Sequence, residues 1–225
     1  MELVLLSIAP ALLVMIYIYY SDKYDKEPRH LLFICFLFGA VGSIFLAAIS
    51  HFFVSKYYPE FEEQIIWIQF CKAFVVVALV EEFSKYIFVR YFAQTRKAFD
   101  EPFDGIVYAV MVSMGFAVTE NLAYAFQGGI EVALYRAFTA VPAHATFGII
   151  MGYYMGKAKF SRYRVRYNLM GLALAVFFHG IYDFFLFINY IPGISVGAFM
   201  SLAIGILLSQ KAIRIHQENS HFKPK

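Results

Sequence analysis

Ionisable side chains inside apolar stretches are the first feature of this sequence that could do chemistry. Each Asp, Glu or Lys in the middle of a bilayer costs about 2–3.5 kcal/mol on insertion scales, so five of them cost about 10 kcal/mol. That sum is comparable with the net stability of a whole domain, and a purely structural bundle would carry leucine instead. We therefore interpret these groups as functional. They are Glu81, Glu82, Lys85, Glu120, His144, His179 and Asp183.

The spacing of these side chains groups them on shared helix faces. Glu81 and Lys85 lie four residues apart, so one helical turn brings the ammonium group against the carboxylate. Glu82 lies three residues before Lys85. His179 and Asp183 repeat the four-residue spacing, and this carboxylate could orient the imidazole and raise its basicity.

Two further patterns accompany the charges. Glu120 follows Phe116 by four residues and has Asn121 beside it. His144 begins a series of glycines at four-residue steps, which lets two helices approach closely and places His144 toward protein rather than lipid. These glycines are Gly148, Gly152 and Gly156.

The charges narrow the chemistry without choosing one reaction. Four carboxyls face one lysine, and full ionisation would leave a net charge of about −3 in a medium of low dielectric. One of Glu81 and Glu82 can then act as a base while the other stays neutral or pairs with Lys85. A glutamate base, an imidazole and an amide or acid donor are the parts needed to attack a peptide carbonyl with water. The same parts could bind a metal ion or relay protons.

The composition indicates that membrane helices position these groups. The 225 residues are 61% hydrophobic, 20% aromatic and 16% charged, with a net charge of +3. Soluble domains are about 25% charged, and disordered chains have low hydrophobicity. A net charge of +3 also argues against a nucleic-acid partner. We predict an all-α, polytopic transmembrane bundle in a lipid bilayer.

About seven apolar stretches approach the roughly 20 residues that a bilayer core requires. Turn residues and charges occupy the loops between them, including Pro59 in the loop 55–64 and Gly128-Gly129. We predict one membrane-embedded domain over residues 1–208 and a short basic tail over 209–225. The predicted spans are Leu3–Tyr20, Leu31–Val54, Ile65–Val89, Ile106–Phe126, Ala133–Met155, Leu169–Tyr190 and the shorter Ile194–Leu208.

Basic residues predict the orientation. Alternate loops and the tail hold 15 basic residues, against 3 on the other side, and the positive-inside rule makes the first group cytoplasmic. The N-terminus is then outside and the C-terminus inside. At 1.5 Å per residue, the predicted site residues lie roughly 13–21 Å from the cytoplasmic ends of their spans, so one convergent site is possible.

Other polar groups have ordinary explanations. Cys35 and Cys71 lie in apolar stretches without a CxxC motif and are expected to be buried thiols. Asp104 stands beside Pro102 at the end of a span, so we expect a helix cap or an interfacial carboxylate there. The chain contains no HExxH motif, which weakens a zinc-protease interpretation.

These motifs, in this order and in separate apolar spans, resemble the PrsW family of glutamate-type intramembrane proteases, which is related to the CAAX-processing enzymes. The CAAX-type enzymes carry EExxxR and FxxxH, whereas this chain has Lys85 and Glu120, which favours PrsW. The resemblance is carried by the segment 22–28, Glu81-Glu82-x-x-Lys85, Phe103-Asp104-Gly105, Gly115-Phe116-x-x-x-Glu120-Asn121, His144 with its glycines, and His179-x-x-x-Asp183.

The resemblance implies a role for each motif. Glu81 would activate the attacking water, while Glu82 would share or tune the proton and be held by Lys85. Glu120 with Asn121 would position water or substrate. His179 would stabilise the oxyanion, oriented by Asp183, and His144 would complete the site or pack it.

The resemblance also implies a biological setting. The enzyme would lie in the bacterial cytoplasmic membrane and make the first cleavage of a single-span anti-sigma factor, without a metal or other cofactor. Three alternatives remain open from the residues. They are a zinc protease using His144, His179, Asp183 and a glutamate, a proton-coupled transporter, and a non-catalytic scaffold.

Overall fold

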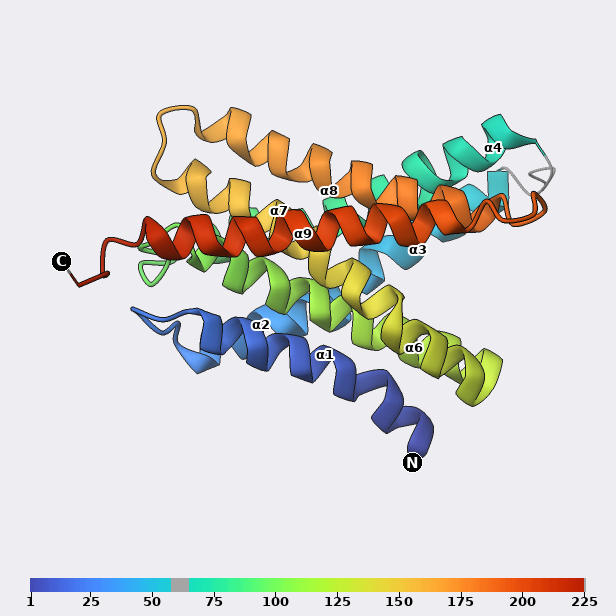
Figure 1. The fold of residues 1–225 in the computed structure, drawn as a ribbon, viewed down its shortest axis with the longest axis horizontal. Helices are drawn as coiled ribbons and strands as arrows, with labels where there is room; N and C mark the ends of the chain where they lie inside the picture. Colours follow the sequence, from blue (N-terminus) through green and yellow to red (C-terminus); the bar gives the residue numbers. More distant parts are fainter. Residues whose placement is uncertain (58–64, 225) are drawn as a thin grey trace.

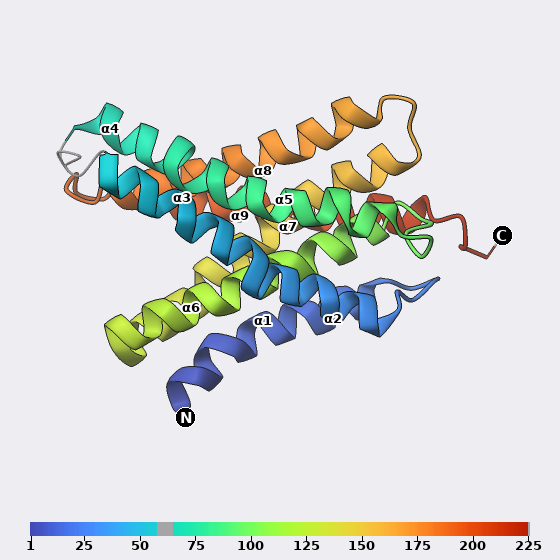
Figure 2. The ribbon, with the colours of Figure 1, turned by 180° about the vertical axis from the view of Figure 1, so that it is seen from behind.

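The computed structural model describes residues 1–57 and 65–224, and these residues form a bundle of helices that contains no β-strand (Figures 1 and 2). The predicted all-α class is confirmed. The π-helical segments η1 and η2 join α2 to α3 and α4 to α5, and the short 3₁₀ helix η3 follows α5. The elements are α1 (Glu2–Ser21), α2 (Arg29–Leu37), η1 (Phe38–Ser43), α3 (Ile44–Tyr57), α4 (Ile66–Cys71), η2 (Lys72–Ala78), α5 (Leu79–Tyr91), η3 (Ala93–Thr95), α6 (Asp104–Phe138), α7 (Ala140–Lys159), α8 (Arg164–Phe187) and α9 (Val196–Glu218).

Five helical stretches of the described chain are long and apolar enough to cross a membrane. The 56-residue stretch Asp104–Lys159 contains two of the predicted spans. Helical geometry is interrupted at Gly129, whose φ is 76°, and Figure 1 shows the chain turning back from the yellow-green end of α6 into α7. The predicted span Ile65–Val89 is helical as α4, η2 and α5, but its charges keep it outside the five. The protein is therefore a multi-pass membrane protein, and its orientation stays a prediction.

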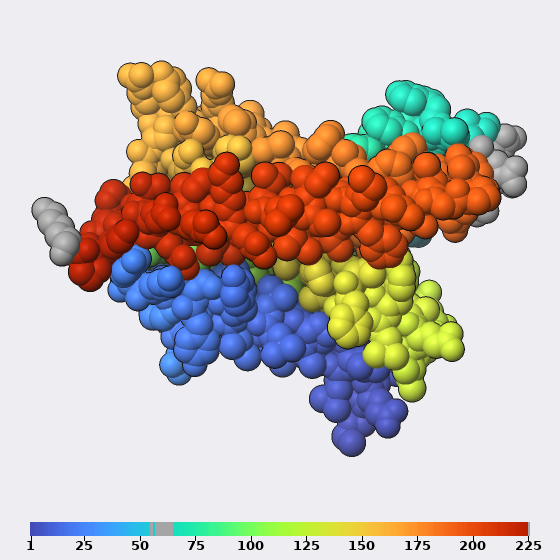
Figure 3. Space-filling model, viewed as in Figure 1, coloured from blue at the N-terminus to red at the C-terminus, as the bar shows by residue number. Residues whose placement is uncertain are grey.

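One predicted boundary differs from the structure, and one predicted loop falls mostly outside the described residues. Helix α9 continues to Glu218, beyond the predicted end at Leu208, because Ile213 and His216 repeat the buried face of the helix, and His216 Nε2 lies 2.9 Å from the Tyr153 carbonyl oxygen. Figure 3 shows α9 lying along one face of the bundle. The predicted loop over 55–64 falls mostly on residues 58–64, outside the described part of the chain.

Helices α6 and α7 pack backbone against backbone at the centre of the bundle. A Cβ added to Gly152 would lie 2.3 Å from the Gly105 carbonyl oxygen, and one added to Gly156 would lie 2.0 Å from that of Pro102. The predicted role of the glycine series is confirmed, since it turns the His144 face of α7 toward protein.

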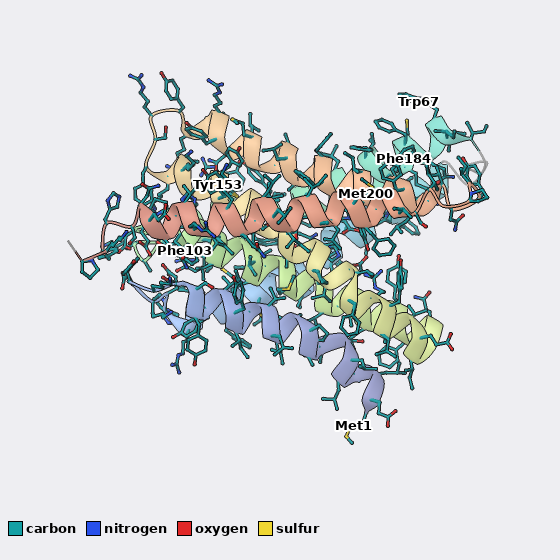
Figure 4. The ribbon with its side chains drawn as sticks, viewed as in Figure 1. Met1, Trp67, Phe103, Tyr153, Phe184 and Met200 are labelled. Carbon is teal, nitrogen blue, oxygen red and sulfur yellow. The ribbon has the colours of Figure 1, made fainter. Side chains whose placement is uncertain are left out.

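Buried carboxylates gather at the end of the bundle that holds the C-terminus (Figure 1). Oδ2 of Asp104 accepts hydrogen bonds of 2.7 Å from the backbone N–H groups of Asp100 and Glu101. Asp104 is the first residue of α6 and its side chain holds the preceding loop, so it does not act as the expected helix cap. The Tyr108 hydroxyl donates to Glu27, which ties the loop after α1 to α6. Figure 4 shows Phe103 toward this end and Trp67 at the opposite one.

We expect the Gly156→Ala variant to lose stability. The added methyl group would meet backbone rather than a flexible side chain, and forcing such a contact costs about 1–3 kcal/mol. Thermal unfolding in detergent micelles measures the loss. Gly128→Ala is the control, because the atoms nearest to its methyl group would belong to the Val132 side chain and not to backbone. Equal unfolding temperatures for Gly156→Ala and the parent would contradict the packing argument.

Two buried carboxyl groups in the loop after α1 lead us to expect that the stability of the protein falls as pH rises. Burial raises the pKa of Asp22 to about 7, against the nearby Lys26 ammonium, and likewise raises the pKa of Glu27 to about 7. In the unfolded chain these groups have pKa values of about 4, so between about pH 4 and 7 the folded protein binds more protons than the unfolded one. The stability that these protons confer is complete below about pH 4 and is lost as pH rises through about 7.

Thermal unfolding at pH 5 and pH 8 tests this expectation. The protein should unfold at the higher temperature at pH 5, and the difference should shrink in the Asp22→Asn, Glu27→Gln double variant. An unchanged difference in the double variant would assign the pH dependence to other groups.

Candidate functional site

Four helices bring the predicted site residues together. Glu81, Glu82 and Lys85 come from α5, Glu120 and Asn121 from α6, His144 from α7, and His179 and Asp183 from α8. All eight belong to one network of hydrogen bonds and ion pairs, to which Arg136 also belongs. Most of them are buried.

Lys85 lies at the centre of this network. Its Nζ is 2.7 Å from Glu82 Oε1, 3.2 Å from His144 Nδ1 and 3.8 Å from Glu81 Oε2. The ammonium group also lies 4.1 Å from the centre of the Phe116 ring. The predicted pairing of Lys85 with the adjacent glutamates is present, and the stronger contact goes to Glu82.

His179 lies between three carboxylates. Its Nδ1 is 2.9 Å from Glu82 Oε1, and its Nε2 is 3.2 Å from Asp183 Oδ2 and 4.0 Å from Glu81 Oε2. The ring stacks on Phe147 with centroids 4.7 Å apart. These contacts fix the plane of the imidazole and leave its Nε2 edge between Glu81 and Asp183.

Glu120 and Asn121 contact a residue that the sequence motifs did not identify. Glu120 Oε2 lies 2.8 Å from His144 Nε2 and 2.6 Å from Arg136 Nη2, while Arg136 Nε donates to Asn121 Oδ1 at 2.9 Å. The guanidinium also lies 4.1 Å from the Tyr124 ring. The signal for Arg136 was present, since it is an arginine inside the apolar span Ala133–Met155.

A cavity of about 200 Å³ adjoins the network. Glu81, Glu120, His144, His179 and Asp183 line it, whereas Glu82, Lys85 and Asn121 do not. Its wall also contains apolar and aromatic side chains, among them Val77, Phe147, Tyr182, Leu186 and Phe187. Oε2 of Glu81 is buried and has no hydrogen-bond partner among the described residues. Oε2 of Glu82 is likewise buried without such a partner. The two adjacent glutamates differ because Glu81 lines the cavity, whereas Glu82 does not and its Oε1 contacts Lys85 and His179.

Breaks in regular helix surround the cavity. The π-helical segment η2 ends three residues before Glu81, and such segments are frequent at functional sites. Thr139, with φ −120° and ψ −64°, interrupts the chain between α6 and α7 at the cavity wall. Pro142 contributes, because it has no N–H to donate to the carbonyl of Phe138.

The cavity lies toward one end of the bundle. Its lining includes Leu186 and Phe187, the last residues of α8, and that end lies opposite the C-terminus of the chain in Figure 1. The basic loops predict this end to be extracytoplasmic. The space beside Glu81 is thus nearer to the predicted outer side of the membrane.

Three of the site residues could hold a metal ion. Glu81, His144 and His179 each offer one donor atom, and these atoms lie within 4.8 Å of one another. Two imidazoles and one carboxylate form a common zinc ligand set, and the unpartnered Glu81 oxygen is free to bind. The donor types and separations fit a metal, although both nitrogens of each imidazole contact other groups. Asp183 is not one of these three residues, although the zinc-protease alternative drawn from the sequence included it.

The comparisons with known proteins agree on one family. Residues 27–209 match the family model described as "PrsW family intramembrane metalloprotease". The chain is 38% identical to Protease PrsW of Geobacillus kaustophilus over 200 residues, covering 88% of this chain and 86% of the relative. It is 41% identical to Protease PrsW of Oceanobacillus iheyensis and 36% identical to that of Bacillus subtilis, in each case over 80% of both chains. No solved structure matches the chain.

Proposed function

The chain belongs to the PrsW family of intramembrane proteases, and we propose that it hydrolyses a peptide bond with a water molecule activated by Glu81. The observation that carries this proposal is that Glu81, and not Glu82, lines the cavity together with His179, and that Oε2 of Glu81 has no hydrogen-bond partner among the described residues. The family assignment favours a protease over the transporter and scaffold alternatives.

Glu81 is the proposed base of the reaction. It takes a proton from water, the hydroxide oxygen bonds to the carbonyl carbon, and the C–O double bond becomes a C–O⁻ bond. The C–N bond then breaks, the C=O bond reforms, and the leaving nitrogen takes the proton back from Glu81. The contacts of Glu82 with Lys85 and His179 make it a tuning and positioning residue, as the resemblance implied.

His179 is the proposed donor to the oxyanion. Its Nδ1 is held by Glu82, and its Nε2 edge lies between Glu81 and Asp183, at 4.0 and 3.2 Å. An oxygen in the cavity beside Glu81 can share the Nε2 hydrogen with Asp183. A positioned donor of this kind is worth about 10²–10³ in rate.

Glu120 and His144 form the proposed opposite wall of the site. Both line the cavity, and their mutual contact of 2.8 Å holds each of them in place beside the reacting groups. Asn121 does not line the cavity, so its proposed contribution is indirect.

The proposed substrate is a single-span anti-sigma factor in the bacterial cytoplasmic membrane. The family resemblance supplies this substrate, and the place of the cavity supports a first cut near its extracytoplasmic segment. The apolar wall of Val77, Leu186 and Phe187 suits an apolar stretch of such a chain.

A metalloprotease is the second candidate, because the family description names one and the donor set fits. Glu81, His144 and His179 would hold the ion, and a zinc ion in such a site lowers the pKa of water and polarises a carbonyl. His179 would then be a ligand rather than an oxyanion donor. If Nε2 were the ligand, Glu82 would orient the His179 ring through Nδ1.

Co-expression with an anti-sigma substrate tests the catalytic proposal. We expect Glu81→Gln to lower cleavage about 10³-fold or more, because general-base catalysis is lost, and Glu82→Gln and His179→Ala to lower it about 10²-fold or more. Immunoblotting of substrate and product in membranes measures the effect, with equal insertion checked for each variant. Glu131→Gln and His221→Ala, which alter exposed residues, are the controls. Cleavage that persists in all three site variants would reject the mechanism.

Metal analysis separates the two candidates. For the metal-independent mechanism we expect less than stoichiometric zinc in the purified, active protein, and cleavage that resists a strong chelator. Stoichiometric zinc that falls in His144→Ala, together with chelator-sensitive activity restored by zinc, would establish the metalloprotease instead.

A further inference from the structure

Arg136 occupies a part of α6 that side-chain contacts must hold in place. Gly129, with φ 76° and ψ −163°, and Thr139 interrupt the helix on either side of residues 130–138. At both breaks the backbone leaves helical dihedral angles. Arg136 connects this segment to the part of α6 before Gly129 through Glu120 and Asn121.

The contacts of Arg136 form a fixed clamp on Glu120. Its Nη2 lies 2.6 Å from Glu120 Oε2, its Nε lies 2.9 Å from Asn121 Oδ1, and its charge lies over the Tyr124 ring. The side chain of Arg136 is only 15% exposed. A planar guanidinium held by several partners orients a carboxylate more narrowly than an ammonium would.

The clamp extends to Lys85 through His144. Oε2 of Glu120 accepts from Arg136 and also lies 2.8 Å from His144 Nε2, which therefore carries the hydrogen of that bond. His144 Nδ1 is then an acceptor, and it faces the Lys85 ammonium at 3.2 Å. One chain of contacts thus runs from Arg136 to Lys85.

The place of Lys85 matters because a second carboxylate competes for it. Lys85 Nζ is 2.7 Å from Glu82 and 3.8 Å from Oε2 of Glu81, the glutamate that lines the cavity. The contact with His144 helps to hold the ammonium on the Glu82 side. A shift of about 1 Å toward Glu81 would give the proposed base a direct ammonium partner and weaken it.

We propose that Arg136 is a positioning residue of the protease site: by clamping Glu120 it orients His144, which holds Lys85 on Glu82 and leaves Glu81 free. The inference rests on the proposed role of Glu81. Arg136 acts through Glu120 and His144, although it also lines the cavity.

A purely structural role for Arg136 gives a different expectation. As a tether alone it would lower stability and yield, while the folded fraction would cleave at the normal rate. As a positioning residue it lowers the rate of the bound complex. Comparing the change in kcat with the change in KM therefore separates the two roles, because losing the orientation of the reacting groups lowers kcat.

The experiment uses the purified full chain in micelles and a peptide substrate that spans the cleavage region. We expect Arg136→Met to lower kcat about 10–100-fold with less than a twofold change in KM. Arg136→Lys should recover at least part of the loss, since it keeps a charge near Glu120. In a double-mutant cycle, adding Glu120→Gln to Arg136→Met should cost less than the product of the single effects, since both disturb one unit. Arg162→Met, at an exposed arginine, is the control.

Three outcomes would overturn the inference: Arg136→Met with normal kcat per folded molecule, Arg136→Lys no better than Arg136→Met, or independent effects of Arg136 and Glu120. If Arg136→Met does not fold, the comparison of Arg136→Gln with Arg136→Lys gives the same decision. Glu81→Gln in the same assay separates the two proposals. Full activity of Glu81→Gln would reject the proposed function, whereas an inactive Glu81→Gln beside a fully active Arg136→Met would reject the inference alone.

Discussion

The pairing of the buried Lys85 ammonium is the constraint on which the site depends. An ammonium group in a medium of low dielectric is tolerated only when charge and hydrogen bonds compensate it, because its desolvation costs several kcal/mol. Glu82 supplies the charge, His144 an acceptor, and Phe116 an aromatic face. These three partners come from α5, α7 and α6. The contacts that stabilise the Lys85 ammonium group therefore hold three helices together around the cavity.

Two adjacent glutamates can then have different roles, because their side chains point to different surroundings. Neighbouring residues on an α-helix point about 100° apart, since 3.6 residues complete a turn. Glu82 points to Lys85 and His179, and Glu81 points to the cavity. The helix thus separates Glu82, which is held by its partners, from Glu81, which lines the cavity. The role of each glutamate depends on which residues the other helices place opposite it.

The parts of the site that follow helical periodicity could be predicted from sequence, and the parts that depend on chain reversal could not. The pairs Glu81 with Lys85 and His179 with Asp183 lie on single helices, and both are in contact. The packing of Gly152 and Gly156 follows from the same periodicity. The contact of Arg136 with Glu120 requires knowledge that the chain turns at Gly129 and runs back beside itself, and spacing alone does not give that register.

Local backbone irregularity set a further limit on prediction. The π-helical segment η2 consists of apolar residues apart from Lys72, and no glycine or proline marks it. It shifts the register of the α4–η2–α5 run, so the depth of Glu81 could not be obtained at 1.5 Å per residue. The extent of α9 was missed for another reason: Lys211 and Arg214 suggested a basic tail, whereas Ile213 and His216 continue its buried face.

The position of Lys85 also bears on whether a metal ion can enter the site. A dication held by Glu81, His144 and His179 would lie close to an ammonium that is 3.2 Å from His144 Nδ1 and 3.8 Å from Glu81. Like charges at such separations repel strongly when water is excluded. Lys85 would have to withdraw toward Glu82, giving up the contact with His144. An ammonium in its present position and a metal ion therefore disfavour each other, and Glu82 is the carboxylate that would have to hold Lys85 away from the ion.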